Sequence, residues 1–514
     1  MSLRSIPAPP FEQPHENERA AAQPDTTTLD QPPPRGPALD PPPPTREPGR
    51  HRMVREGVQR GGYLILAMLG AFLLTKIIFR LPESNAVLYA YGVAVTAVVF
   101  LQMSVSFLRY KDPALGGVRP RAAVPAAPEG SRTDDDGAGD TAVLVSCLVA
   151  VHNDERVIEQ CVRSLVGQTH GTLEVIVVDD ASTDGTAASL AALADECGIR
   201  VITLDHNVGK KKALAVGLLE TSGEIFAFSD SDSLWAPDAV ERAVGILERH
   251  PEVGAISGHC RALNADDSLL TKVQDTWYEG QFSVRKAFES VFGAVTCVSG
   301  PLAVFRREAI YNYIPAWTSD RFLGEEFRFA TDRSLTAYAL MSPSRAHTLQ
   351  EQHRDSPFLA TVFPWRPWTS VYSKSMRAWT VVPHSFSGLM HQQVRWKKSF
   401  VRNLFFTGGF YWRRPVIAAF AYYLHALFVF AGPIVAFRHV VYLPLQGNIE
   451  SGVSYLLGIL LIGTMFGLAF RREETENQAW WVYRPLMSFL STLVLSWLIL
   501  YSIATIKKMT WVRG

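Results

Sequence analysis

The sequence contains few charged residues and no excess of either sign. Lys, Arg, Asp and Glu make up 19% of its 514 residues, whereas about 25% is usual in soluble proteins. The 50 basic residues nearly balance the 49 acidic ones and the formal net charge is +1, so no overall field favours nucleic acid as a partner. Hydrophobic residues make up 47% and gather in long uncharged runs, which excludes a fully soluble protein.

Cysteine is also scarce, and its spacing follows no ligand pattern. The number of cysteines is odd, and they form neither a C-x-x-C pair nor a Cys/His spacing typical of zinc sites. Neither a disulfide framework nor a zinc centre is therefore expected, and reduced cytosolic thiols fit better. The cysteines are Cys147, Cys161, Cys197, Cys260 and Cys297.

The amino-terminal region divides into a proline-rich tail and two apolar runs. Residues 1–56 hold 14 of the 32 prolines and almost no aromatic residues, a composition typical of disordered segments. Gly61–Phe79 and Ala86–Leu108 each match the roughly 20 residues that cross a bilayer. Basic residues flank the pair, so the positive-inside rule predicts a hairpin of two transmembrane helices over 61–108, with both ends in the cytoplasm.

A soluble α/β domain is predicted over residues 141–383, after a linker rich in Pro, Ala, Gly and Asp at 112–140. Short apolar strands alternate with segments of helical spacing, which predicts a mainly parallel sheet covered by helices on both faces. Ligands of such sheets bind at the carboxyl ends of the strands. The expected strands are Val143–Val151, Leu173–Val178, Arg200–Leu204 and Ile225–Phe228, and the expected helices are Arg156–Gln168, Ala187–Glu196 and Lys210–Glu220.

The carboxyl-terminal third is basic and aromatic at first, and then strongly apolar. Residues 384–412 have an amphipathic pattern that suits helices in the membrane interface, and residues 416–506 contain three more candidate spans. Five spans in all would place the basic final segment, 507–514, outside the cell, against the positive-inside rule. The number of spans therefore stays open. The three later candidates are Val416–Ala436, Val453–Phe470 and Leu486–Ile506.

Acidic residues follow two of the predicted strands. Asp230-Ser231-Asp232 closes the strand at 225–228, and Asp179-Asp180 closes the strand at 173–178. The hard oxygen donors of Asp230 and Asp232 suit Mg2+ or Mn2+, ions that neutralise a diphosphate leaving group. The alternative for Asp230-Ser231-Asp232 is a strand-to-loop turn with a capping Asp, and the alternative for the motif that begins with Asp179-Asp180 is an N-cap of the following helix.

Three consecutive lysines, Lys210 to Lys212, open the helix that follows Asn207-Val208-Gly209. The helix macrodipole is positive at that end, so cations are unfavourable there unless an anion lies close. A bound diphosphate is one such anion. A solvated basic face is the alternative.

Further short motifs follow in a fixed order along the chain. They are V-V-D-D-A-S-T-D-G-T at 177–186, N-V-G-K-K-K-A at 207–213, S-D-S-D at 229–232, S-G-P-L at 299–302, A-T-D-R-S-L-T at 330–336 and Q-Q-V-R-W-K-K-S at 392–399. Over about residues 61–514 this series resembles processive family-2 glycosyltransferases of the GT-A fold. Among them it is most similar to hyaluronan synthases, and chitooligosaccharide and cellulose synthases are more distant. Q-x-x-R-W on an interfacial helix is the specific mark of the polymer-making members.

The resemblance implies an α/β GT-A catalytic domain joined to interfacial helices and an α-helical transmembrane region. It implies that Asp332 is the general base, held in place by Arg333, and that Asp232 with Asp230 binds Mg2+ or Mn2+. The acceptor sugar would contact Ser299, Gly300 and Pro301 and stack on the indole of Trp396. UDP would be bound by Asp180, Lys210, Asp230, Gln392, Arg395 and Trp511.

Three features depart from the family pattern. Thr331 stands where the family has an acidic residue beside the base, and Trp511-Val512-Arg513-Gly514 matches the terminal motif only at Trp511. Residues 341–370 form a longer connection than the family usually has, and we expect this insertion to border the acceptor site.

The expected function is an inverting, processive β-glycosyltransferase that polymerises UDP-GlcNAc and UDP-GlcA, as hyaluronan synthases do, and exports the product through its own helices. Its partners would be UDP-sugars, the growing polysaccharide and the bilayer of the cell membrane, with a cytoplasmic catalytic domain. A homopolymer synthase of GlcNAc or glucose is the alternative within this class. Outside it, a non-catalytic nucleotide-sugar sensor or export partner is the alternative, and a transferase that modifies a lipid carrier once does not need Q-x-x-R-W. The sugars and the oligomeric state stay open.

Overall fold

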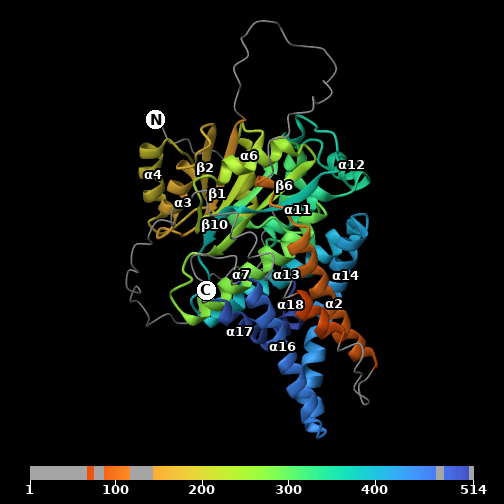
Figure 1. Ribbon diagram of the computed structural model, residues 1–514. Helices are drawn as coiled ribbons and strands as arrows, with labels where there is room; N and C mark the ends of the chain where they lie inside the picture. Colours follow the sequence, from red (N-terminus) through yellow and green to blue (C-terminus); the bar gives the residue numbers. More distant parts are fainter. Residues whose placement is uncertain (1–65, 75–85, 116–142, 471–479, 509–514) are drawn as a thin grey trace, which may run out of the picture.

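The computed structural model describes residues 66–74, 86–115, 143–470 and 480–508. Figure 1 shows a sheet flanked by helices in the upper part and long helices below it, with α7 (Leu269–Gly280) and α13 (Phe386–Tyr411) at the junction. The predicted tail at 1–56 and the terminal Trp511 lie outside the described residues.

Eight strands form one mixed, mainly parallel sheet, which confirms the predicted fold class. Their order is β3-β2-β1-β4-β7-β6-β10-β5, and β7 and β5 run antiparallel to their neighbours. A separate hairpin pairs β8 with β9. The strands are β1 (Val145–Val151), β2 (Leu173–Asp179), β3 (Arg200–Thr203), β4 (Ile225–Asp230), β5 (Ser233–Trp235), β6 (Val253–Ala262), β7 (Ala303–Arg306), β8 (Arg321–Phe322), β9 (Glu325–Glu326) and β10 (Thr369–Thr380).

Helices cover both faces of the sheet, so β1 is buried along its whole length. Successive side chains of a strand point to opposite faces: Leu148 packs with α5 and α11, and Val149 packs with α3, α4 and α6. Burial on both faces explains why the strands are continuous apolar runs. The helices are α3 (Ile158–Val166), α4 (Thr186–Cys197), α5 (Lys210–Leu219), α6 (Ala239–Arg249), α9 (Arg307–Ile310), α10 (Ile314–Thr318) and α11 (Thr331–Leu340).

The strand topology brings the two acidic motifs to one edge of the sheet. β1 lies between β2 and β4 and runs parallel to both. Val151 of β1 pairs with Asp179, and the preceding Ala150 pairs with Asp230. The carboxyl ends of these three strands therefore form the floor on which a ligand would lie.

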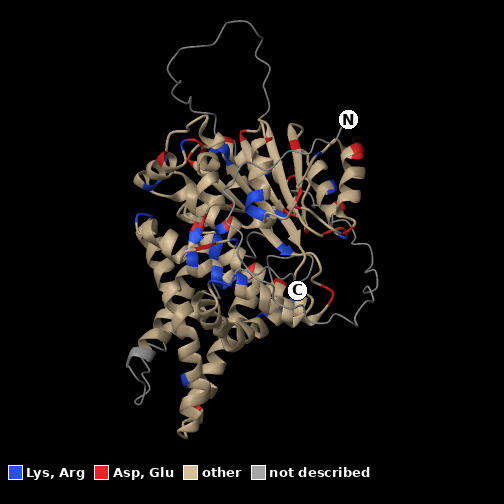
Figure 2. Ribbon diagram, turned by 180° about the vertical axis from the view of Figure 1, so that it is seen from behind, with Lys and Arg blue, Asp and Glu red and all other residues tan. Residues whose placement is uncertain are grey.

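Four helices in the described part of the chain are long and apolar enough to cross a bilayer. Figure 2 shows that charged residues gather in the sheet domain and at the junction, whereas the lower helices are almost uncharged. Of the predicted span Gly61–Phe79, only residues 66–74 are described, and they are helical. The four candidates are Tyr89–Leu115, Val416–Leu445, Ile449–Gly467 and Arg484–Ala504. They overlap with α2 (Ala86–Leu108), α14 (Val416–Phe437), α16 (Ile449–Phe470), α17 (Arg484–Phe489) and α18 (Leu498–Ala504).

The last candidate span returns to the underside of the sheet domain. Residues 384–412 form one helix, α13 (Phe386–Tyr411), where several interfacial helices were expected. α18 packs along it: Ser502 Oγ donates to the Val394 carbonyl at 3.4 Å, and Lys398 Nζ donates to the Lys508 carbonyl at 2.6 Å. Lys508 therefore lies on the same side as the sheet domain, as the positive-inside rule requires.

The segment 341–370 packs away from the cavity that holds the predicted acceptor-binding residues. It contains α12 (Pro343–Gln352) and a short 3-10 turn, Pro357–Leu359. Asn312 holds the segment by donating to the carbonyls of Phe358 and Thr361, at 2.7 and 2.8 Å. None of its residues lines the cavity described below. The expectation that it borders the acceptor site is therefore wrong.

The first residues of the predicted linker anchor α2 to the sheet. The Asp112 carboxylate accepts hydrogen bonds from Ser373 Oγ and from the Ser375 N–H, both at 2.7 Å. Both donors belong to β10, so the end of α2 is fixed to the edge region of the sheet. Residues 116–142 lie outside the described residues.

Candidate active site

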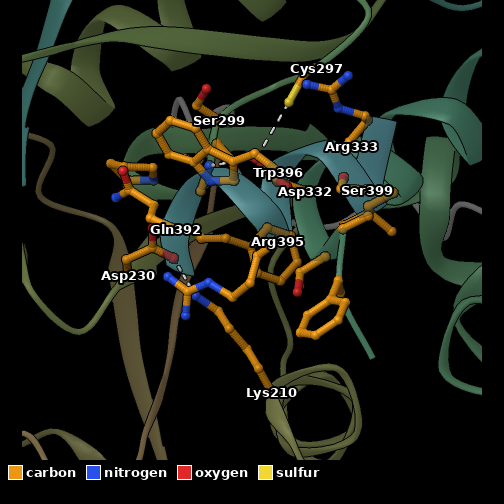
Figure 3. A pocket seen from close by; sticks show the side chains of 18 of the residues that line it. Lys210, Asp230, Cys297, Ser299, Asp332, Arg333, Gln392, Arg395, Trp396 and Ser399 are labelled. Atoms are coloured by element: carbon orange, nitrogen blue, oxygen red, sulfur yellow. Dashed lines mark hydrogen bonds and ion pairs between the residues drawn. The ribbon is translucent and has the colours of Figure 1, made fainter. Parts of the chain in front are cut away.

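One cavity of about 980 Å³ lies at the carboxyl ends of β1, β2 and β4 and continues to the junction with the long helices. It brings together every predicted site residue that the structure describes; Trp511 lies outside the described residues. The predicted site residues that line it are Asp180, Lys210, Asp230, Asp232, Ser299, Gly300, Pro301, Asp332, Arg333, Gln392, Arg395 and Trp396. Figure 3 shows Lys210 of α5, Asp230 of β4, Asp332 of α11 and Trp396 of α13 converging.

Asp180 organises the loop before α5. Its carboxylate is buried and accepts backbone hydrogen bonds from Val208 at 2.7 Å and from Gly209 at 2.9 Å. Gly209 has φ +86, a conformation that favours glycine. Burial raises the pKa of Asp180 above its ordinary value, although the two N–H groups lower it in part. Each carboxylate oxygen has a second lone pair with which to accept from a ligand.

The Asp230 carboxylate forms an ion pair with Lys210 at the end of β4. It also lies over Gly300: a Cβ on that glycine would stand 2.8 Å from one carboxylate oxygen and 2.9 Å from the other. Burial lowers the pKa of Lys210, but Asp230 and Asp232 outweigh it and the net pKa is raised. Lys210 is thus a cation fixed beside the acidic pair.

The three lysines of α5 each contact a carboxylate of the protein. Lys210 pairs with Asp230, Lys211 with Asp320 at 3.2 Å, and Lys212 with Glu326 at 2.9 Å. These acids already offset the unfavourable macrodipole. The prediction that the lysines require an external anion therefore applies at most to Lys210, which faces the cavity beside Asp230.

The two carboxylates of D-x-D could serve as half of a divalent-metal site. Asp232 accepts from Thr380 Oγ1 at 3.1 Å and lines the same cavity as Asp230. Within the described ranges no three His, Cys, Asp or Glu side chains gather as a metal cage. Mg2+ commonly takes one or two carboxylates and completes its shell with substrate phosphates and water, so the donor set fits an ion that binds together with a nucleotide diphosphate.

Asp332 lies in the first turn of α11, close to Gly300. Its Oδ2 is 3.4 Å from both the Cys297 thiol and the Gly300 N–H. Burial, followed by the charge of Asp332, raises the pKa of Cys297 to about 11, so the thiol stays protonated and donates. Arg333 lines the cavity but forms no hydrogen bond or ion pair with Asp332. Cys297 and Gly300 are therefore the hydrogen-bond partners of the carboxylate, and Arg333 interacts with it through charge alone.

A non-glycine residue in the left-handed conformation precedes α11. Ala330 has φ +64 and lies at the start of the helix. Such strain costs about 1–3 kcal/mol and persists only where the surroundings enforce it. The Trp317 indole donates to the Thr331 carbonyl at 3.0 Å and holds this turn in place.

The Q-x-x-R-W residues lie on one face of α13. Gln392, Arg395 and Trp396 are separated by three and four residues, which places them side by side. The Trp396 ring stacks on Trp277 with a centroid distance of 5.3 Å and an interplanar angle of 13°, and it meets Tyr278 edge-on at 6.3 Å. The indole is therefore held by protein aromatics beside the cavity, which argues against a plain bilayer anchor.

Sequence reasoning missed several residues of the cavity. Trp277 and Tyr278 belong to α7 (Leu269–Gly280), and Lys286 ends the π-helical segment η3 (Gln281–Lys286). Lys286 Nζ donates to Ser257 Oγ at 2.8 Å and to Ser299 Oγ, and burial lowers its pKa. The adjacent aromatic pair at 277–278 was the only local signal, because the partners of these residues lie far away in the sequence.

One family model and several known proteins are similar to this sequence. Residues 146–314 match the family described as glycosyl transferase family 2. A hyaluronan synthase of Streptococcus pyogenes is 27% identical over 380 residues, which cover 72% of this chain and 82% of the relative. An N-acetylglucosaminyltransferase of Rhizobium leguminosarum bv. viciae is 32% identical over 264 residues, 51% of this chain. The chain spans 55% of the length of this second relative.

Among solved structures, the mannosyltransferase PcManGT from Pyrobaculum calidifontis, in complex with GDP-Man and Mn2+, is similar to this chain. The TM-score is 0.41 and the identity 20%, over 79% of this chain and 99% of the other. A likeness of this size says nothing about what the present chain binds.

Proposed function

We propose that the chain is a member of glycosyltransferase family 2, whose model matches residues 146–314, and that it joins UDP-activated sugars into a polysaccharide and passes the product across the membrane between its own helices. It is related to hyaluronan synthase and to the rhizobial N-acetylglucosaminyltransferase. These relatives suggest two candidate products, a hyaluronan-like polymer and a polymer of GlcNAc.

The continuity of the cavity carries this proposal. Its lining runs from Asp180 and Lys210 at the nucleotide end, past Asp332 and Trp396, to residues of the apolar helices. An acceptor stacked on Trp396 would thus lie between the donor and the helices. A transferase that releases each product to the cytoplasm has no use for such a path. The lining residues from the apolar helices are His425, Val429, Ser491 and Leu495.

In the proposed reaction, Asp332 takes the proton of the acceptor hydroxyl as its oxygen attacks C1 of the donor sugar. The bond between C1 and the phosphate oxygen breaks, and UDP departs with the electron pair. One base is sufficient, and the product has the inverted anomeric configuration because no covalent intermediate forms. Arg395 and Lys210 would stabilise the charge that develops on the diphosphate. The Cys297 thiol and the Gly300 N–H orient the base.

Asp230 and Asp232 would hold Mg2+ or Mn2+ together with the diphosphate. When bound, the ion supplies charge neutralisation for the leaving group. Gly300 lets the Asp230 carboxylate lie close to the backbone, since any larger residue would collide with it.

Cations outnumber acids where the cavity reaches the helices, which favours an anionic product. Arg285 donates to His425 of α14 at 3.0 Å and pairs with Glu289 at 3.4 Å, and among the described residues Lys286 donates hydrogen bonds only to hydroxyl groups. Burial lowers the pKa of Lys397 to about 8, as for a cation without enough anionic neighbours. A carboxylate on alternate sugars would neutralise this region, so the product is proposed to be hyaluronan-like, from UDP-GlcNAc and UDP-GlcA. The cations concerned are Arg285, Lys286, Arg333 and Lys397, against the acids Glu289 and Asp332.

The protein is proposed to lie in the cell membrane with its sheet domain in the cytoplasm. The four apolar helices in the described part of the chain would supply the anchor, and UDP-sugars are cytoplasmic substrates under this proposal. The positions of Lys398 and Lys508 on the side of the sheet domain agree with the positive-inside rule.

The test is incubation of the purified, detergent-solubilised protein with labelled UDP-sugars, singly and in pairs. The proposal expects high-molecular-weight product only when UDP-GlcNAc and UDP-GlcA are both present. Polymer from UDP-GlcNAc alone, or from UDP-glucose alone, would replace the hyaluronan-like product by a homopolymer. UDP binding without any product would instead favour a nucleotide-sugar sensor.

A further inference from the structure

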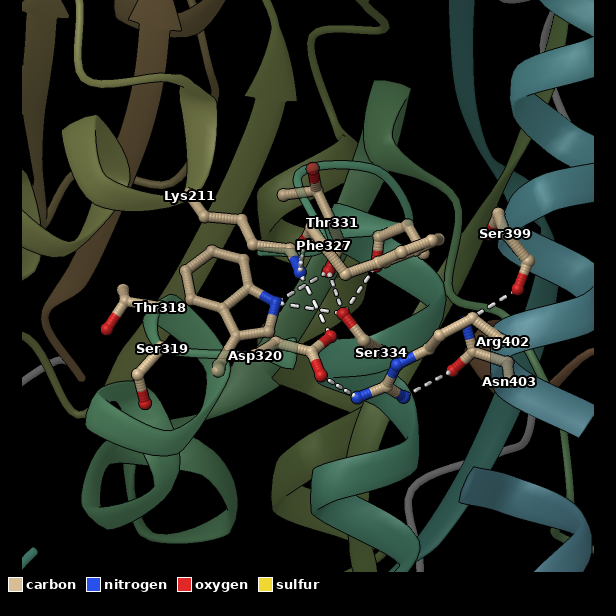
Figure 4. Close-up of polar contacts among 12 residues, drawn as sticks. Lys211, Thr318, Ser319, Asp320, Phe327, Thr331, Ser334, Ser399, Arg402 and Asn403 are labelled. Atoms are coloured by element: carbon tan, nitrogen blue, oxygen red, sulfur yellow. Dashed lines mark hydrogen bonds and ion pairs between the residues drawn. The ribbon is translucent and has the colours of Figure 1, made fainter. Parts of the chain in front are cut away.

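A buried carboxylate joins three elements of the chain beside the cavity. Asp320 lies between α10 and β8, and it forms ion pairs with Lys211 of α5, at 3.2 Å, and with Arg402 of α13. The three side chains are buried, with between 4% and 6% of their surface exposed. Figure 4 shows them converging from different directions.

The backbone near Asp320 takes part in the same cluster. Lys211 Nζ also donates to the Phe327 carbonyl at 2.8 Å, and the Phe327 N–H donates to the Asp320 carbonyl at 2.8 Å. These bonds close the base of the β8–β9 hairpin, which leads through Ala330 into α11. The position of Asp320 therefore helps to set where Asp332 lies.

Each of the three elements carries a different part of the candidate site. α5 begins with Lys210 at the nucleotide end, the hairpin leads to Asp332, and α13 carries Arg395 and Trp396. Arg402 follows Arg395 by seven residues, about two turns, and so lies on the same face of α13. The Asp320 carboxylate thus connects the three elements that carry the proposed donor-binding residue, the proposed base and the proposed acceptor platform.

The charges of this cluster are costly for stability alone. Burial lowers the pKa of Lys211 to about 8, and Arg402 adds to this, although Asp320 acts against it. Well-packed apolar residues in place of such a group often stabilise a fold as well or better. A requirement for fixed geometry explains why two cations and one acid are buried here.

We propose that Asp320 is a positioning residue for glycosyl transfer, which holds the acceptor helix α13 at a fixed place relative to Asp332 and the nucleotide end of α5. This rests on the proposed function, since it takes Trp396 as the acceptor platform and Asp332 as the base. Without the contact the acceptor would shift from C1 of the donor, and a misplacement of about 1 Å can cost about 100-fold in rate. Water needs no platform and would still reach the donor.

Two substitutions test this role. Asp320→Asn keeps the shape of the side chain and removes its charge. Arg402→Met removes only the ion pair with α13 and leaves the ion pair between Lys211 and Asp320, whose charges cancel. In both, polymer formation should fall about tenfold or more, while UDP affinity by calorimetry and slow UDP-sugar hydrolysis stay within about twofold. Arg402→Lys, which keeps the charge but not the planar fork, should restore part of the transfer.

Glu326→Gln is the matched control. Glu326 also joins the hairpin to α5, through Lys212, but this pair is about one-third exposed and does not involve α13. Its ratio of transfer to hydrolysis should stay near that of the wild type. An equal fall of that ratio in Glu326→Gln would assign the effect to the hairpin as a whole and overturn the role of Asp320.

Arg402→Met keeps the test decisive if Asp320→Asn fails to fold, because it leaves no buried charge unpaired. Parallel loss of UDP binding, hydrolysis and transfer in Arg402→Met would make the cluster a general structural feature and overturn the proposal. Unchanged transfer in Arg402→Met would do the same. If the wild-type protein forms no glycosidic product at all, the proposed function fails, and this proposal fails with it. The ratios measured in the variants can refute the role of Asp320 but cannot by themselves refute the proposed function.

Discussion

Trp396 offers the sharpest test of processive synthesis. We expect Trp396→Ala to bind UDP normally and to hydrolyse UDP-sugar slowly, but to make much shorter product. The ring lies beside the cavity, stacked on Trp277 at a centroid distance of 5.3 Å. No hydrogen bond joins it to Asp180 or Asp230, whose carboxylates bond to Val208, Gly209 and Lys210. Its removal should therefore affect the acceptor and leave the donor site intact.

The magnitude follows from the stacking energy. An aromatic stack contributes about 0.5–1.5 kcal/mol beyond buried area, and each 1.4 kcal/mol changes an equilibrium constant about tenfold. Release of the growing chain should thus become about two- to tenfold faster relative to extension, and mean product length should fall by a similar factor. Trp396→Phe, which keeps a ring to stack on Trp277, should lose less.

The assay is gel electrophoresis of radiolabelled product, with UDP binding measured by calorimetry as the control for an intact donor site. Unchanged high-molecular-weight polymer from Trp396→Ala would reduce Trp396 to a structural aromatic and remove the main support for a processive enzyme. Loss of UDP binding would show that the substitution damages the donor site and would refute the separation of donor from acceptor.

Three further substitutions address the metal, the base and the floor of the site. Asp232→Asn should fold and yet lose activity, because an amide cannot neutralise the leaving group, and excess EDTA should abolish wild-type activity; full activity in EDTA would count against a metal. Asp332→Asn should lower transfer about 100-fold or more with nearly unchanged UDP affinity, and a collapse of UDP affinity would make Asp332 a donor ligand. Gly300→Ala places a Cβ 2.8 Å from an Asp230 oxygen and should weaken UDP binding in Mn2+ more than in EDTA; equal affinity in both would show that Asp230 is not a metal ligand.

Local sequence patterns predicted the fold well, and they predicted that the acidic candidate residues share one edge of the sheet. Continuous apolar runs predicted the central strands because both faces of the sheet are covered. The acidic residues that end β2 and β4 meet at one edge because β1 runs parallel between them. Those facts depend on periodicity and on the order of elements, which a sequence reveals directly.

The pairings across long separations were not predictable in this way. Asp320 sits in no motif, and its partners Lys211 and Arg402 are 109 and 82 residues away. The same limit applies to Cys297, whose thiol holds a carboxylate 35 residues further on. The segment 341–370 was misplaced for a related reason: its length was visible, but the direction in which it packs depends on Asn312.

The most direct test of the central claim is protection of the product in proteoliposomes with the sheet domain facing outward. Labelled UDP-GlcNAc and UDP-GlcA are added outside, and the vesicles are then treated with a hyaluronan-degrading enzyme, with or without detergent. The account predicts labelled polymer that resists the enzyme until detergent opens the vesicles, because the chain leaves the cavity between the helices. Polymer that is fully degraded without detergent would contradict export through the protein, and the absence of any polymer would contradict the proposed synthesis.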